Sequence, residues 1–181
     1  MGRILSEDES AEQLRSFEHT AFRLEQQRAY IEPVESEMFS RFLAGDLTPP
    51  TDTPAAREWF AKVAGHVAEG RRIERVRVQE EPPTPYQRWQ RWFDHWNKEA
   101  GESIRYMARQ RAFDVGLLPA AGDEDWWLFD SCRLMAMRYD MDGHLLETEL
   151  VTEPERVVHA CAWRDLAVHH STSEVARGRA A

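Results

Sequence analysis

Two predicted elements carry the side chains best suited to bind a ligand. The segment 71–80 alternates apolar and charged residues, which predicts a strand with its arginines on one face. The next segment, 85–100, has the spacing of an amphipathic helix. The candidate binding residues on these elements are Arg75, Arg77, Tyr86, Arg88 and Arg91. Aromatic rings interleaved with guanidinium groups suit an anionic ligand or an acidic segment of a partner. The alternative is that the aromatic residues of the helix form only core.

Three further residues could take part in acid–base or electrostatic chemistry. His95 lies among aromatic and charged residues of the predicted helix, and it is either a general base or a histidine satisfied by a nearby carboxylate. Asp130 and Arg133 flank a predicted turn, where pairing within the turn is the alternative to a functional role. An enzyme built on this chain would have to combine such residues with Tyr86.

The sequence lacks the local motifs of nucleotide, zinc and acyl-transfer chemistry. It contains no P-loop, no G-x-G-x-x-G, no H-E-x-x-H, no G-x-S-x-G and no C-x-x-C. Cys132 and Cys161 do not have metal-ligand spacing, and the acidic run 123–125 is expected to be a solvated loop. We therefore expect neither a cofactor nor a metal ion.

Length and charge limit the class of protein. The 181 residues suit one domain, and the formal net charge is -9, from 32 acidic and 23 basic residues. This balance disfavours direct binding of nucleic acid, which requires a positive face. No signal peptide and no apolar run of membrane-spanning length is recognisable, so a cytoplasmic protein is expected.

The predicted elements are organised around a central segment, 125–150, read as an antiparallel meander of strands at 127–129, 133–139 and 144–150. Turn residues at 130–131 and 140–143 separate these strands. The other predicted elements are strands at 20–28, 71–80 and 103–109, and helices at 33–44, 54–69, 85–100 and 153–170. The expected fold is a single α/β (α+β) domain over 17–170. It has a mixed sheet with helices packed on its faces, after a frayed lead-in (1–16) and before a disordered tail (171–181).

Four stretches together resemble an actinomycete family of domains of unknown function. They are FEHTAFRLE (17–25), EPPTPYQRWQ (81–90), AGESIRYMAR (100–109) and WLFD…MRYDMDG (127–143). The resemblance extends from Phe17 to Val168. Members of that family are commonly encoded beside helix-turn-helix regulators, so the resemblance implies a regulatory setting and no particular reaction.

The order of elements also resembles, more distantly, one half of a phospholipase-D-like α/β domain. Members that hydrolyse phosphodiesters use an H-x-K-x-x-x-x-D motif, which this sequence lacks. Its nearest stretch, 95–98 (HWNK), has different spacing and lies on a predicted helix. The resemblance therefore implies the shell of such a domain without its catalytic residues, as in the sensor domains of some transcription regulators.

These observations favour a non-enzymatic cytoplasmic regulatory protein that binds a helix-turn-helix protein or a small anionic ligand. The alternative is a small enzyme or toxin-like hydrolase, of a secondary-metabolite or regulatory locus, that uses the non-local residues named above.

Overall fold

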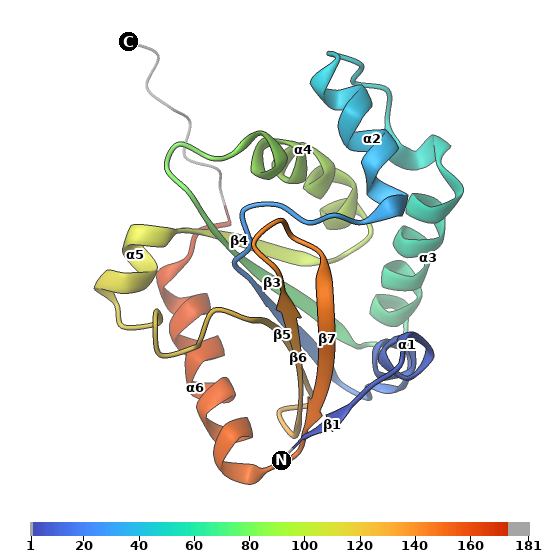
Figure 1. The fold of residues 1–181 in the computed structure, drawn as a ribbon. Coiled ribbons are helices and arrows are strands. Elements are labelled where there is room, and N and C mark those ends of the chain that lie inside the picture. Colours follow the sequence, from blue (N-terminus) through green and yellow to red (C-terminus); the bar gives the residue numbers. More distant parts are fainter. Residues whose placement is uncertain (1, 174–181) are drawn as a thin grey trace.

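A computed structural model describes residues 2–173, which form one mixed sheet with helices on both faces (Figure 1). The order of the seven strands in the sheet is β1-β7-β6-β5-β2-β3-β4. The strands are β1 (Arg3–Ile4), β2 (Thr20–Glu25), β3 (Arg72–Gln79), β4 (Ser103–Ala108), β5 (Asp125–Phe129), β6 (Arg133–Tyr139) and β7 (Leu145–Val151). The helices are α1 (Glu7–Ser16), α2 (Pro33–Leu43), α3 (Pro54–Ala68), α4 (Pro85–Glu99), α5 (Arg109–Asp114) and α6 (Pro154–His170). The predicted α/β fold is confirmed.

The two halves of the sheet differ in strand direction. β2, β3 and β4 are parallel, because α2 and α3 connect the first pair and α4 connects the second. β5, β6 and β7 form the predicted antiparallel meander, and β5 joins the halves by pairing antiparallel with β2. The turn between β5 and β6 has positive φ at Asp130 (52°) and Ser131 (55°). At the next turn Gly143 has φ 98°, and a Cβ there would lie 2.5 Å from the carbonyl oxygen of Ala29.

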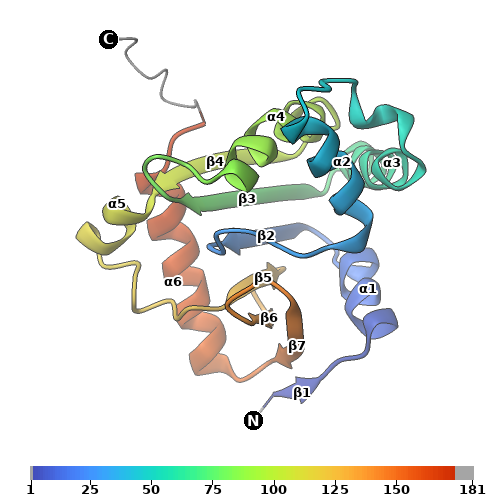
Figure 2. The same ribbon diagram turned by 45° about the horizontal axis from the view of Figure 1, so that its top comes forward.

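Helices α5 and α6 cover one face of the sheet, and α1, α2, α3 and α4 lie over the other (Figure 2). The first face is a continuous apolar core in which Phe22, Val76 and Trp126 pack against Ala160 and Ala167. The second face is apolar mainly near α1 and α3 and is aromatic near α2 and α4. It also contains buried charged side chains.

The first sixteen residues are not a frayed lead-in as predicted. Ser6 begins α1 with a capping box, in which the Ser6 hydroxyl accepts from the Glu9 amide and the Glu9 carboxylate accepts from the Ser6 amide. Arg3 pairs with Leu150 of β7, and Leu5 is buried. The S-x-x-E pattern of 6–9 is the sequence signal for this helix start, but the acidic composition of the segment suggested a frayed end.

Three other predictions of where elements begin or end differ from the structure. Between the strands predicted at 103–109 and 127–129, where no element was predicted, the chain forms most of α5, and the strand expected over 20–28 ends at Glu25. At the end of the chain Thr172 forms a bridge with Tyr106, so the predicted disordered tail does not begin at 171. The rest of that tail, 174–181, lies outside the described residues. Between residues 2 and 173 no helix is both long and apolar enough to cross a membrane.

Candidate functional site

A cavity of about 620 Å³ lies between the second face of the sheet and helices α1, α2, α3 and α4. Its floor is formed by β2, β3, β5 and β6, with a charged part made by Arg23, Glu25, Arg75 and Arg77 and an aromatic part made by Trp127. The helices supply the walls, and residues of β7 form part of the rim. The cavity thus joins an apolar enclosure to a set of buried charges.

The alternation of residues in two adjacent parallel strands explains the charged floor. In β2, Arg23 and Glu25 point to the opposite face from Phe22 and Leu24. The parallel register then sets Arg23 beside Arg75 and Glu25 beside Arg77. Four charged side chains therefore meet on one face, where the sheet would otherwise be apolar.

Glu25 is shared by three guanidinium groups. Its Oε1 accepts a hydrogen bond of 2.7 Å from Arg75 Nη1 and lies 3.0 Å from Arg23 Nε. Its Oε2 accepts from Arg77 Nη1. Glu25, Arg75 and Arg77 are each less than 8% exposed, so this pairing offsets the cost of removing the charges from water.

Asp94 and Glu102 complete the pairing behind the floor. Arg77 donates to Asp94 through Nε (2.9 Å) and Nη2 (2.7 Å), and Arg75 Nε donates to Glu102 at 2.7 Å. The Tyr106 hydroxyl and the Asn97 amide also donate to Asp94, at 2.9 and 3.0 Å. Burial alone would raise the pKa of Asp94, but Arg77, together with Arg75 and Asn97, holds that pKa below its usual value. Asp94 is therefore a charged partner of Arg77.

Asp125 is a buried group and not part of a solvated loop as predicted. It begins β5, where it accepts hydrogen bonds from the Gln26 amide (2.9 Å) and the Tyr30 hydroxyl and lies 3.6 Å from Arg23. Burial raises the pKa of Asp125 above its usual value, and Arg23 and Tyr30 only partly oppose this rise. The burial of Asp125 was not predicted, because the acidic run 123–125 resembles a solvated loop and only its last residue belongs to the sheet.

The face that α4 turns to the sheet is more polar than the sequence predicts. Tyr86 and Trp89 of the predicted aromatic stripe are buried, whereas Trp92, Phe93 and Trp96 are only partly buried. The other buried residues of this helix, three or four positions apart, are Gln87, Gln90, Asp94 and Asn97. Of this polar series, Asp94 pairs with Arg77 of β3, and the Asn97 side-chain amide donates to Asp94.

A carboxylate and several aromatic rings line the helical side of the cavity. Tyr86 donates its hydroxyl hydrogen to Glu35 of α2. Burial raises the pKa of Glu35 above its usual value, and the charge of Glu32 adds to the rise, while Tyr86 and the guanidinium groups of Arg23 and Arg75 oppose it. Trp89 also lines the cavity, is 2% exposed, and its indole N–H has no hydrogen-bond partner among the described residues.

Three of the eight sequence-predicted site residues line this cavity: Arg75, Arg77 and Tyr86. Arg88 is exposed and donates to the Pro83 carbonyl at 3.2 Å. Arg91 donates to Gln79 at 2.6 Å and lies over the ring of Tyr106. His95 is exposed, 3.2 Å from Glu99, which matches the interpretation of a histidine satisfied by a carboxylate.

Asp130 and Arg133 lie at the other end of β2. The Asp130 carboxylate accepts hydrogen bonds from the amides of Glu18, His19 and Thr20 at 2.7–2.9 Å, and Arg133 lies 3.5 Å from it. Burial raises the pKa of Asp130, but the three amides and Arg133 together bring it below its usual value. The contact with Arg133 is the pairing within the turn that the sequence suggested, whereas the bonds to the amides of 18–20 were not predicted. The residues of the alternative enzyme site, which also include Tyr86 and His95, are not brought together.

Several residues were missed from the sequence: Arg23, Glu25, Tyr30, Glu35 and Trp127, which line the cavity, and Asp94, which lies behind its floor. The alternation of FRLE (22–25) carries the signal for Arg23 and Glu25, since an apolar–charged repeat in a strand beside another such strand places charges together. The spacing of the polar series on α4 carries the signal for Asp94. Glu35 has no local signal, because its position depends on how α2 packs.

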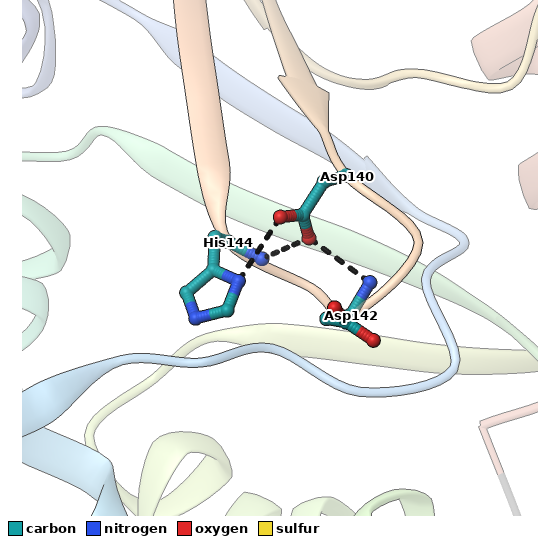
Figure 3. Close-up of side chains that lie close together, drawn as sticks. All are labelled: Asp140, Asp142 and His144. Atoms are coloured by element: carbon teal, nitrogen blue, oxygen red, sulfur yellow. Dashed lines mark hydrogen bonds and ion pairs between the residues drawn. The ribbon is translucent and has the colours of Figure 1, made fainter.

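The turn between β6 and β7 groups Asp140, Asp142 and His144 on the surface (Figure 3). Asp140 Oδ1 accepts from the amides of Asp142, Gly143 and His144 at 2.8–2.9 Å, and Oδ2 lies 3.0 Å from His144 Nδ1. Asp142 and His144 are exposed. The Asp140 carboxylate therefore stabilises the turn, and the turn geometry accounts for the proximity of the three side chains.

Comparison with known proteins gives one family match. The family model described as "Domain of unknown function (DUF6879)" matches residues 8–175, which is nearly the whole chain. The chain therefore belongs to this family. No curated protein matches it.

Proposed function

We propose that this member of the DUF6879 family is a non-enzymatic cytoplasmic regulatory protein that binds a small organic molecule in the cavity under α1, α2, α3 and α4. The observation that carries the proposal is the cavity itself. Its volume of about 620 Å³ falls within the range of roughly 300–1,000 Å³ that small-molecule sites occupy. Its lining combines apolar and aromatic side chains with convergent polar and charged groups, and small-molecule sites join these two kinds of surface.

The unmatched indole N–H of Trp89 supports a bound molecule. A buried donor without a partner costs roughly 1–3 kcal/mol. Trp89 lines the cavity, so an acceptor atom of a ligand that reached its indole nitrogen would remove this cost. Ligand binding and the stability of the fold would then be linked, as expected of a sensor.

We further propose a helix-turn-helix regulator as the partner that reads the ligand state. The resemblance to actinomycete proteins encoded beside such regulators supports this choice. Apolar residues at the cavity rim also support it, because Val34 is 60% exposed and Leu146 is 56% exposed. A partner that covers this rim would contact residues whose positions depend on what occupies the cavity.

The test is native mass spectrometry of the tagged protein purified gently from its host. The proposal predicts a complex with a helix-turn-helix protein and a small molecule that leaves on activation in the gas phase. Ala11 of α1 lines the cavity, so Ala11→Trp should fill the site and abolish the small-molecule adduct. Ala61→Trp, at an exposed position of α3 outside the cavity, is the matched control and should retain the adduct.

A wild-type protein recovered alone and without any bound small molecule would contradict the proposal. An adduct that persists in a folded Ala11→Trp variant would place the ligand elsewhere. No observation favours the alternative of a hydrolase, since His95, Asp130 and Arg133 lie apart from the cavity and from Tyr86.

A further inference from the structure

The charged residues that line the cavity are mostly acidic. The lining contains three arginines, Arg23, Arg75 and Arg77, and five glutamates, Glu7, Glu25, Glu32, Glu35 and Glu147. Behind the lining, each arginine also contacts another carboxylate, that of Asp125, Glu102 or Asp94 respectively. With all carboxyl groups ionised, acidic groups thus exceed basic ones both in the lining and in the layer behind it.

The arginines are already engaged, which removes the main reason to expect an anionic ligand. All three nitrogens of the Arg77 guanidinium donate to Glu25 or Asp94. Arg75 donates through Nε and Nη1 to Glu102 and Glu25. An anion on the floor would have to compete with carboxylates that are themselves buried and fixed, and separating a buried pair is strongly unfavourable.

Glu35 is partly buried and differs from the fully buried carboxylates of this region. It accepts a hydrogen bond from the Tyr86 hydroxyl, and within residues 2–173 it makes no ion pair. It projects from α2 into the same cavity whose floor is formed by Arg23 and Arg75. A neutral donor satisfies one lone pair of this carboxylate but does not balance its charge.

Aromatic rings surround the same space. Tyr30, Tyr86 and Trp89 line the cavity, with Tyr30 and Trp89 packed 5.8 and 5.1 Å from the ring of Tyr86. Trp59 of α3 lines it as well. The electron-rich faces of such rings attract cations, and rings combined with a carboxylate recognise organic ammonium groups. Arg23 already uses this attraction, because it lies 5.7 Å from the ring centre of Tyr30.

We propose that the ligand of this cavity is an organic cation, a primary amine or ammonium compound with an apolar body, whose charge pairs with Glu35. This inference rests on the proposed function, since it names the chemical class of the molecule bound at the same site. The apolar body would lie against the aromatic walls, and the ammonium group would lie between Glu35 and the rings of Tyr30 and Tyr86.

The electrostatics of the cavity agree with this assignment. Burial raises the pKa of Glu35, so keeping its carboxylate ionised is costly without a partner. A bound cation would favour the ionised form and reverse part of that shift. Glu32 beside it has the same sign of charge and would favour the cation as well.

Isothermal titration calorimetry tests the inference by measuring the affinities of three probes of similar shape. They are phenethylamine (cationic), phenethyl alcohol (neutral) and hydrocinnamate (anionic). We expect phenethylamine to bind best to the wild-type protein. Glu35→Gln retains an acceptor for Tyr86 but removes the charge, and it should weaken phenethylamine binding about tenfold or more, since a buried charge pair is lost. Glu37→Gln, at an exposed position of the same helix outside the cavity, is the matched control and should bind as the wild type does.

The outcomes separate this inference from the proposed function. If the alcohol or hydrocinnamate binds as well as the amine and Ala11→Trp abolishes that binding, the cavity is a ligand site but its ligand is not selected as a cation. Unchanged affinity of phenethylamine for a folded Glu35→Gln variant would also overturn the assignment of Glu35. If none of the three probes binds at millimolar concentration, both the inference and the proposed function lose their support.

Discussion

Replacing Asp94 by asparagine should destabilise the fold strongly although it changes the shape of the side chain little. Asp94 is fully buried and holds two of the three guanidinium nitrogens of Arg77. In Asp94→Asn, Arg77 keeps only the carboxylate of Glu25, which Arg23 and Arg75 also share. Breaking a buried ion pair by removing one partner costs about 3–5 kcal/mol. Domains have free energies of unfolding of about 5–15 kcal/mol, so the variant should be less stable yet measurable.

Urea unfolding followed by far-ultraviolet circular dichroism measures this loss. Asp114→Asn is the matched control, because Asp114 is exposed on α5 and accepts one hydrogen bond from Gln110. The control should change the free energy of unfolding by less than about 1 kcal/mol. A loss below about 1 kcal/mol in Asp94→Asn, equal to that of the control, would refute the view that this pair compensates the buried charge of the floor.

Three further predictions concern separate parts of the molecule. The pKa of Asp94 lies below its usual value of 3.8. The stability that its ionised form contributes is therefore present above pH 3.8 and is lost as the pH falls through the lowered pKa. The free energy of unfolding, measured over a series of acid pH values, should show this loss in the wild type and less of it in Asp94→Asn. Asp130→Ala should cost about 1–3 kcal/mol in urea unfolding, since the amides of Glu18, His19 and Thr20 lose their acceptor, while the exposed His95→Ala should change stability by less than about 0.5 kcal/mol. The affinity for phenethylamine should fall on acidification, starting above pH 4.5, because protonation of Glu35 removes the charge that pairs with the ammonium group. The groups that act on the pKa of Glu35 are Glu32, Tyr86, Arg23 and Arg75. An affinity that does not depend on pH, or an equal fall in Glu35→Gln, would contradict this.

Much of the fold could be predicted from local patterns. The alternation of RRIERVRVQE (71–80) and the turn residues at 130–131 and 140–143 identify β3 and the meander, because short-range sterics and burial decide them. The segment 1–16 was mistaken for a frayed end because its composition is acidic. Its capping box and the pairing of β1 with β7 depend on a spacing and on a contact across 147 positions of the chain.

The candidate site was only partly predictable, for a different reason. Arg75, Arg77 and Tyr86 were identified because their own elements have clear periodicity. Arg88, Arg91 and His95 were grouped with them because they lie on the same helix as Tyr86. The helix, however, turns a different face to the sheet. The partners that neutralise the arginines, such as Glu25 and Glu102, come from other elements. The residue pattern of one strand does not indicate which charged residues of distant segments will pair with its side chains.

The most direct test of ligand binding in the cavity is a carbon-13 methyl spectrum of methionine-labelled protein titrated with phenethylamine. Met38, Met135 and Met137 line the cavity, whereas Met107 packs in the core on the opposite face of the sheet and Met141 is exposed at a turn. We predict that the methyl signals of Met38, Met135 and Met137 shift with a common saturation, while those of Met107 and Met141 stay unchanged. Shifts confined to Met107 or Met141, or no shift at saturating probe, would contradict ligand binding in this cavity.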